Sequence, residues 1–194
     1  MIYRASWWDG ADEALAALRD QYRRDRTEGQ DVSIFLAVEK AGMVVQLESW
    51  FGHLGVPVVA LAGYSSQTLV RSVVDDAERQ QRPGVLIYAG DFDPSGEDIL
   101  RDWEARTNCW SAVERVALSA DQVGEYKLPT APGKAGDSRA AAFTSRHGQL
   151  VQVELDALNP AVLRDLYDGA LVGYWDVSSY AASIEREESD RAYL

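Results

Sequence analysis

The segment from Val85 to Gly96 most constrains the fold of this 194-residue chain. It begins with five consecutive apolar residues, which predict a buried strand, and Pro94 suits the first turn of a following helix. Two carboxylates, Asp91 and Asp93, lie between the strand and the helix. Residues i and i+2 of an extended segment point the same way, so both carboxylates could converge on one hard cation. The segment therefore predicts an acidic site at a strand end, of a kind that suits phosphate chemistry.

The rest of the chain alternates between predicted strands and predicted helices. Apolar runs predict strands at residues 33–38, 56–62, 85–89, 115–118 and 151–155. Helical periodicity, capping residues and proline positions predict helices at residues 11–26, 42–54, 65–81, 94–106, 160–170 and 178–193. Residues 126–136 have the composition of a loop. The alternation predicts an α/β fold, a mostly parallel sheet flanked by helices, with an N-terminal helix and a helical C-terminal extension. No linker divides the chain, so we expect a single domain over residues 1–194.

Composition limits the classes of protein to consider. Hydrophobic residues make up 46% of the chain, which is enough for a core. No apolar run approaches the ~18 residues of a membrane span, and the first residues do not resemble a secretory signal, so we expect a cytoplasmic protein that does not contact a membrane. The single cysteine, Cys109, excludes an internal disulfide and argues against a thiolate zinc site. A metal bound here would have oxygen ligands.

Net charge is the main argument against a nucleic-acid partner. The chain carries a formal charge of −12, whereas neutralisation of phosphates needs Lys and Arg. However, residues 154–194 contain nine acidic residues and three Arg, an excess of −6 that is half of the total. The early helix carries Arg19, Arg23, Arg24 and Arg26. Such an uneven distribution leaves room for a basic face.

A third acid is expected beside Asp91 and Asp93. Glu39 ends the first predicted strand, and the aspartates end the third. Ligands of an open parallel sheet bind beyond the carboxyl ends of the strands, so the three acids can meet in one crevice. Close carboxylates raise one another's pKa unless a cation neutralises them, and Mg²⁺ takes carboxylates together with phosphate oxygens. Simpler roles stay open, because Asp93 can cap the following helix and Glu39 can form a surface pair with Lys40.

These residues carry a resemblance to a known family. A Glu that closes one strand, followed by an Asp-x-Asp that closes a later one, resembles the toprim domain of topoisomerases, bacterial primases and OLD-type nucleases. Residues Gly90–Gly96 resemble more narrowly the Asp-x-Asp-Pro-x-Gly form of the topoisomerase VI A subunit and its meiotic relatives. Ala62–Ser66 is similar to the Gly-Tyr turn after their second strand, and Val153–Leu158 is similar to their later Glu-x-x-Ala-Leu segment. The resemblance covers about residues 33–158.

The resemblance implies a toprim (Rossmann-like) core at about residues 31–158 and a helical extension at about 159–194. It implies that Glu39, Asp91 and Asp93 are catalytic and bind Mg²⁺ or Mn²⁺, with Glu39 as a metal ligand or general acid/base. The expected partner is nucleic acid, in the first place DNA. The residues expected to contact it are Lys40, Gly63, Tyr64 and Arg71.

The resemblance also has a limit. In the topoisomerase VI type, the attacking tyrosine lies in a winged-helix domain before the toprim domain, whereas only about thirty residues precede the first predicted strand here. Metal-assisted hydrolysis is therefore easier to support than covalent strand passage. A partner subunit could supply the tyrosine or a DNA-binding domain.

Three functions stay open. The leading expectation is a Mg²⁺-dependent nuclease or a topoisomerase-like subunit that cleaves DNA. An Asp-x-Asp also approximates the nucleophile motif of haloacid-dehalogenase phosphatases, but Lys127 and Lys134 follow no predicted strand, and the acidic pair Asp75-Asp76 lies upstream. A non-catalytic module that uses the same fold to bind nucleic acid or a partner protein fits the charge of −12. The C-terminal helix could mediate a homodimer.

Other charged residues give weaker indications. Glu154 and Asp156 flank Leu155 in a strand-like alternation, which favours a solvated face. Three basic residues on or near the predicted loop could clamp a phosphate: Lys127, Lys134 and Arg139.

Overall fold

The computed structural model describes residues 7–63 and 65–194. They form two compact units, each considered by itself. The sheet unit comprises Asp31–Trp175, and the terminal unit comprises the residues up to Gln30 together with Asp176–Leu194. Within the described ranges, no helix combines the length and the apolar character that a membrane span requires.

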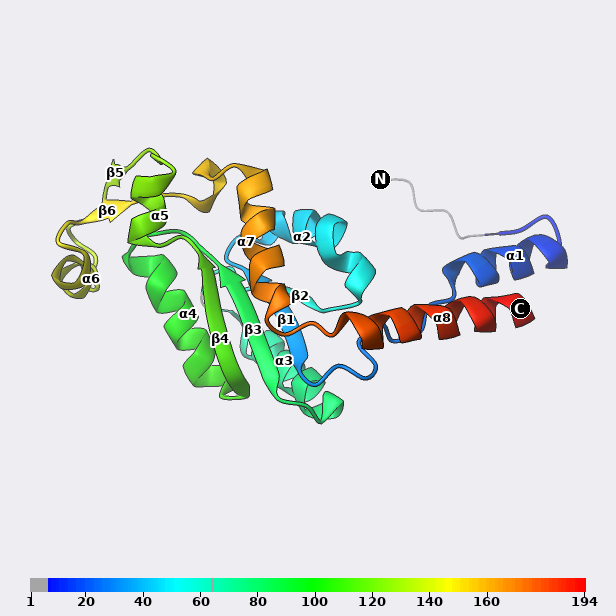
Figure 1. Ribbon diagram of the computed structural model, residues 1–194. Coiled ribbons are helices and arrows are strands. Elements are labelled where there is room, and N and C mark those ends of the chain that lie inside the picture. The colour runs from blue at the N-terminus through cyan, green and yellow to red at the C-terminus, as the bar shows by residue number, and fades with distance from the viewer. Residues whose placement is uncertain (1–6, 64) are drawn as a thin grey trace. The chain divides into compact units, whose positions relative to one another are not determined.

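A four-stranded parallel sheet organises the sheet unit, which confirms the predicted α/β fold (Figure 1). Its strands, in the spatial order β2-β1-β3-β4, are Val58–Ala60, Ser33–Val38, Gly84–Ala89 and Trp110–Ala117. Every residue of β1 and β3 is buried, as expected for central strands covered on both faces. This burial explains why both strands are continuous apolar runs in the sequence.

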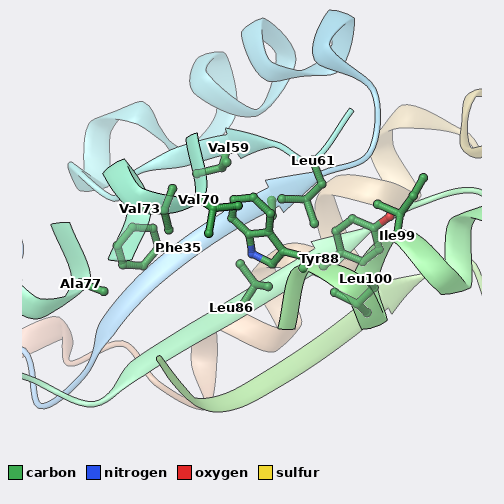
Figure 2. Packing of buried hydrophobic residues seen from close by; sticks show 12 residues of the cluster. Phe35, Val59, Leu61, Val70, Val73, Ala77, Leu86, Tyr88, Ile99 and Leu100 are labelled. Atoms are coloured by element: carbon green, nitrogen blue, oxygen red, sulfur yellow. The ribbon is translucent and has the colours of Figure 1, made fainter. Parts of the chain in front are cut away.

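Helices cover the two faces of the sheet. Phe35 and Leu86, neighbours on β1 and β3, pack with residues of α3 (Gln67–Gln80) and α4 (Pro94–Thr107), including Val70 and Leu100 (Figure 2). On the other side, Tyr167 of α7 (Pro160–Val172) donates a hydrogen bond to the Ala37 carbonyl oxygen and packs against Phe51 of α2 (Val44–Phe51). The 3-10 turns η1 (Ala41–Met43) and η2 (Gly52–Leu54) flank α2.

Two predicted segments differ from the structure near the carboxyl edge. The strand predicted at residues 151–155 is wrong beyond Gln152, because β6 (Val151–Gln152) pairs only with β5 (Ala131–Pro132), and Leu155–Ala157 form the 3-10 turn η3. Strand β4 begins at Trp110 rather than at residue 115. The polar residues of this edge strand interrupt the apolar run from which strands were predicted.

Two short helices were not predicted. Helix α5 (Ala120–Glu125) has a capping box between Ser119 and Gln122, so its Ser-x-x-Gln spacing was a usable signal. Helix α6 (Ala140–His147) buries only Ala140 and Phe143, which is too few residues to produce a periodic pattern.

The terminal unit contains α1 (Ala11–Gln21) and α8 (Val177–Tyr193). The predicted helix at residues 11–26 is wrong beyond Gln21, because Tyr22 is extended and donates a hydrogen bond from its hydroxyl to Asp190. None of the described apolar side chains of this unit is buried. A polar network takes the place of a core.

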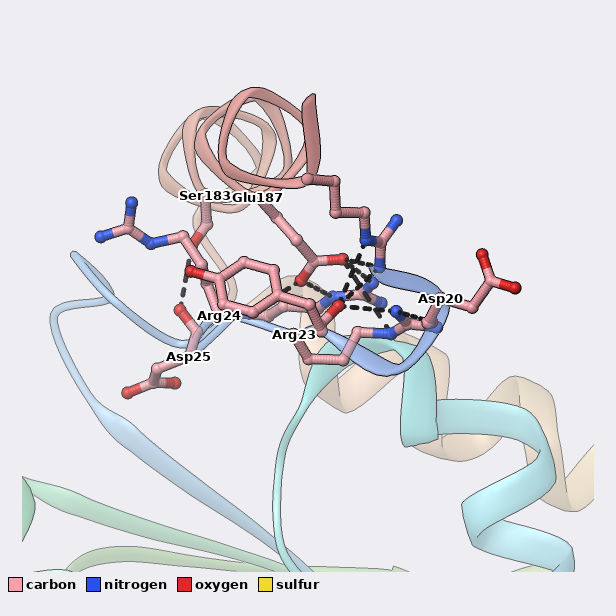
Figure 3. A network of polar contacts seen from close by, with 9 residues as sticks. Asp20, Arg23, Arg24, Asp25, Ser183 and Glu187 are labelled. Carbon is pink, nitrogen blue, oxygen red and sulfur yellow. Dashed lines mark hydrogen bonds and ion pairs between the residues drawn. The ribbon is translucent and has the colours of Figure 1, made fainter. Parts of the chain in front are cut away.

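Glu187 is the centre of this network, and its side chain is only 2% exposed. Its carboxylate accepts hydrogen bonds from the backbone N–H of Arg24 (3.0 Å) and from the guanidinium groups of Arg26 (2.8 Å) and Arg191 (2.6 Å). Figure 3 shows Glu187 pointing from α8 toward the segment that carries Arg23 and Arg24. The hydrogen bonds from Arg26 hold the pKa of Glu187 below its ordinary value, although burial opposes this shift.

We predict that Glu187→Gln weakens the terminal unit by about 1–3 kcal/mol, because it leaves partly buried guanidinium groups without their counter-charge. Hydrogen exchange of the α8 amides measures this loss. The exposed neighbour Glu185→Gln is the matched control and should leave the exchange rates unchanged. Because folding lowers the pKa of Glu187, its stabilisation is present above the pKa of an unfolded Glu and disappears as the pH falls through the lower folded value. Equal exchange rates in both variants would contradict this role.

Candidate functional site

The carboxyl ends of β1 and β3 bring two predicted site residues into contact. Val38 and Ala89 are register partners at the ends of these parallel strands. One residue further on, the Glu39 backbone N–H donates to the Ala89 carbonyl oxygen at 2.9 Å. The Glu39 side chain turns back, and its Oε2 accepts a hydrogen bond from the Asp91 backbone N–H at 2.9 Å. Glu39 therefore lies directly beside the Asp-x-Asp segment.

Two glycines make room for the Glu39 carboxylate. A Cβ on Gly90 would lie 2.1 Å from Tyr88 Oη and 2.8 Å from Glu39 Oε2. A Cβ on Gly96 would lie 2.3 Å from the Asp91 carbonyl oxygen and 3.1 Å from Glu39 Oε2. Real Cβ atoms do not approach rigid atoms this closely, so both positions require glycine. The packing around Glu39 thus accounts for the glycine at each end of the segment Gly90–Gly96.

Phe92 anchors the segment between the two aspartates. Its backbone exchanges two hydrogen bonds with Val153, at 2.9 and 3.0 Å. Its buried ring packs against Phe143 and His147. Because the Phe92 side chain is buried, the side chains of Asp91 and Asp93 on either side of it lie at the carboxyl edge of the sheet. Asp93 Oδ1 accepts from the Gly96 N–H at 2.7 Å, so the capping role that the sequence left open is present.

Asp91 belongs to a second group of charges that includes Lys40. Asp91 Oδ1 accepts from the Leu155 N–H at 2.7 Å and lies 3.5 Å from the Lys40 ammonium nitrogen. The same ammonium donates hydrogen bonds to Glu154 and, at 3.0 Å, to Asp156. Glu154 and Asp156 are exposed, as expected for a solvated face, but they also pair with a site residue.

Arg115 completes the arrangement, and no pattern in the sequence indicated this role. It lies on β4, and its Nη2 donates to the Asp91 carbonyl oxygen at 2.6 Å. Its guanidinium carbon lies 5.8 Å from the centre of the Tyr88 ring. Arg115 Nε is buried and has no hydrogen-bond partner among the described residues. Lys40 and Arg115 therefore both place positive charge close to Asp91.

Burial and mutual repulsion make the acids costly to ionise. Burial raises the pKa of Glu39, and the negative charges of Asp91 and Asp93 add to the increase. The hydrogen bond from the Asp91 N–H and the positive charge of Arg115 act in the opposite direction and lower this pKa. Burial likewise raises the pKa of Asp91, although the hydrogen bond from the Leu155 N–H and the charge of Lys40 both lower it. Burial alone would lower the pKa of Lys40, but its bonds to Glu154 and Asp156 raise it overall. The excess negative charge is thus only partly compensated.

The donor chemistry of the three acids fits a hard cation, although their present arrangement does not form a metal cage. Glu39, Asp91 and Asp93 each use one carboxylate oxygen to accept a backbone N–H. Among the described residues, the second oxygen of each carboxylate accepts no hydrogen bond. Oxygen ligands of this kind are those that Mg²⁺ prefers. However, no group of three or more His, Cys, Asp or Glu within residues 7–63 and 65–194 is positioned to hold a metal ion.

Of the described residues expected to contact nucleic acid, only Lys40 is in contact with a site acid. Lys40 lies at the acidic edge, as described. Gly63 follows β2 with a φ of +63°, a left-handed conformation that favours glycine in a turn. Arg71 on α3 is 68% exposed and pairs with Asp75 of the same helix. Tyr64 lies outside the described residues.

Basic residues do gather beside Asp93. A cavity of about 30 Å³ is lined by Asp93, Pro94 and Lys134 among others, and Pro94 also lines a second cavity of about 380 Å³. The lining of the second cavity includes Arg101, Arg139 and Arg146. A roomier hollow of about 670 Å³ lies on the surface of α3 and contains none of the site acids.

We predict that Gly96→Ala destabilises the sheet unit by about 1–3 kcal/mol, because the added methyl group would overlap the Asp91 carbonyl oxygen. Thermal or urea unfolding measures the change. Gly169→Ala on α7 is the matched control, since a Cβ there meets no atom within 4 Å. Alanine should leave stability unchanged or raise it by up to about 1 kcal/mol at that position. Equal effects of the two substitutions would show that the space around Glu39 does not require glycine.

A search of protein-family models and of curated proteins finds no match to this chain. The residues of the acidic edge themselves therefore provide the basis for a functional interpretation.

Proposed function

We propose that this protein performs Mg²⁺-dependent, toprim-type phosphodiester chemistry on nucleic acid, as a DNA-cleaving nuclease or a topoisomerase-like subunit. One observation carries the proposal. Glu39 and Asp91, from adjacent parallel strands, are in hydrogen-bond contact at the carboxyl edge, and the charge of Asp93 acts on both. The carboxyl edge is where open parallel sheets bind ligands. The toprim resemblance of Gly90–Gly96 supports the same assignment.

The three acids would have distinct tasks. Asp91 and Asp93 would hold the metal through their second oxygens, and Glu39 would hold it or transfer a proton. A raised pKa brings Glu39 closer to neutral pH, where a general acid/base must both gain and lose a proton. When bound, Mg²⁺ would polarise the phosphoryl oxygens and stabilise the charge that develops on them. Lys40 and Arg115 would offset the negative charge that a phosphate adds to an acidic edge.

A non-catalytic module is the second candidate, and Lys40 is the observation that favours it. Its ammonium group contacts Asp91, Glu154 and Asp156, so the chain supplies its own cation at the acidic edge. In that case the site would bind nucleic acid or a partner protein without turnover. Metal dependence and catalysis separate the two candidates.

We predict that purified protein cuts plasmid or single-stranded DNA with Mg²⁺ or Mn²⁺, and that Glu39→Gln and Asp91→Asn reduce the rate by about a hundredfold or more. Each substitution removes a charge that the metal requires. Gel-based cleavage with a chelator control measures the rate. Asp168→Asn on α7, which removes an exposed acid paired with Arg164, should cut normally.

Stability distinguishes loss of chemistry from loss of fold in these variants. Folding raises the pKa of Glu39, so its ionised form destabilises the native state above that pKa, and this cost disappears as the pH falls below the ordinary value. Glu39→Gln should therefore be at least as stable as the parent near neutral pH. Mg²⁺ should raise the melting temperature of the parent more than that of Glu39→Gln. Metal-dependent stabilisation without cleavage of any DNA or RNA would favour the module, and unchanged cleavage in both site variants would exclude the assignment.

The arginine-lined cavity beside Pro94 supports a phosphate backbone as the ligand. Arg101, Arg139 and Arg146 contribute three positive charges, and Glu97 and Asp98 two negative ones. The cavity is thus locally basic in a chain with a net charge of −12. Arg139 reaches Ser95 and Asp98 of α4, so it links the predicted loop region to the helix that Asp93 caps.

We predict that Arg101→Gln and Arg146→Gln each weaken binding of single-stranded DNA by about threefold to tenfold and reduce its salt dependence by about one unit of slope. Fluorescence anisotropy over a salt series measures both. Arg79→Gln is the matched control, because Arg79 is also exposed and pairs with an Asp three residues away, as Arg101 does, but lies on α3. If Arg79→Gln weakened binding as much as the other two, the contact would be non-specific.

A further inference from the structure

Helix α1 exposes an apolar stripe that the described residues of the terminal unit do not cover. Leu15 and Leu18 are 51% and 52% exposed, and no residue of α1 is buried. Trp8, just before the helix, is 48% exposed. Isolated helices shorter than about 12–15 residues are only marginally stable in water, and α1 has 11. A partner that covers the stripe would stabilise the helix.

The spacing of the stripe suits a helical partner. Ala11, Leu15 and Leu18 follow one another at intervals of four and three residues, which is the spacing of a coiled-coil seam. Ala14 and Ala17 are partly buried and lie on an adjacent side of the helix. The exposed surface is therefore a narrow seam and not a broad apolar patch.

Charges beside the seam indicate what the partner is. Asp12 and Arg19 are seven residues apart, so they lie on the same flank of the seam, one at each end. Neither has a hydrogen bond or ion pair with any described residue. A second copy of α1 packed antiparallel would place Leu15 opposite Leu18 and Asp12 beside Arg19, twice by symmetry. A parallel copy would instead place the flank of Asp12 and Arg19 beside the opposite flank of the other helix, which carries Ala14 and Gln21, so the two charges would not meet.

We propose that a second copy of this chain covers the seam, and that the protein forms an antiparallel homodimer through α1. The contact is self-complementary in both shape and charge, as a two-fold interface must be. It uses no residue of the acidic edge, so it is independent of the proposed chemistry. Two three-turn helices bury less than a standard interface of about 1,600 Å², so we expect a dimer that dissociates on dilution.

Sedimentation velocity over a concentration series tests the dimer. The parent chain should shift from monomer to dimer as its concentration rises. Replacing both leucines, Leu15→Gln with Leu18→Gln, should raise the dissociation constant by at least about tenfold, because four apolar side chains leave the interface. Val45→Gln with Val172→Gln is the matched control, since these exposed residues belong to the sheet unit. A parent chain that stays monomeric at every concentration, or a dimer that the leucine substitutions leave intact, would overturn the proposal.

Charge reversal tests the orientation of the helices. Asp12→Arg and Arg19→Asp should each weaken self-association, because like charges then meet across the seam. A mixture of the two variants should associate, since each supplies the charge that the other lacks. Recovery in the mixture requires specific antiparallel pairing and cannot arise from general adhesion. Failure of the mixture to associate while the parent dimerises would place the interface elsewhere. Circular dichroism of each variant verifies that the helices are retained.

Discussion

The hydrogen bond from the Asp91 N–H to the Glu39 carboxylate is the interaction on which the geometry of the candidate site depends. It joins the loops after two adjacent parallel strands and fixes the direction of the Glu39 side chain. Gly90 and Gly96 border that carboxylate, and both must lack a Cβ, which would overlap Tyr88 Oη at Gly90 and the Asp91 carbonyl oxygen at Gly96. Asp93 then begins α4 as its N-cap. The local sequence between β3 and α4 is thus constrained by contacts with Tyr88, Asp91 and Glu39 together.

This arrangement costs electrostatic energy that the chain offsets only in part. The pKa values of Glu39 and Asp91 are raised chiefly by burial, with added repulsion between the acids. A fold that required only a capped helix and a tight turn would not need Glu39 as an acid, since a neutral amide could accept the same hydrogen bond. Retained charge at a cost in stability is typical of functional sites. Lys40 and Arg115 lower the cost but do not remove it.

The sequence predicted the parts of the site that depend on local pattern. Buried parallel strands are apolar runs, and the acid after each run could be assigned to the carboxyl edge before the structure was known. Arg115 could not be found, because its role depends on β4 lying next to β3 and on the register between them. The pairing of Lys40 with Glu154 and Asp156 depends on where the chain returns after β6. The contacts of the terminal unit are polar, so hydrophobic periodicity in the sequence does not record them.

Compensation between charges would also reconcile an acidic protein with the anionic ligand that we propose. The arginines of the cavity beside Pro94 are already paired, Arg101 with Asp98 and Arg146 with Glu97. A phosphate that binds there would replace a carboxylate as the partner of a guanidinium group. A metal ion would similarly compete with Lys40, because both cations would pair with the carboxylate of Asp91. Binding at either place would exchange one ionic partner for another, so its net free energy would depend on geometry more than on the total charge of the chain.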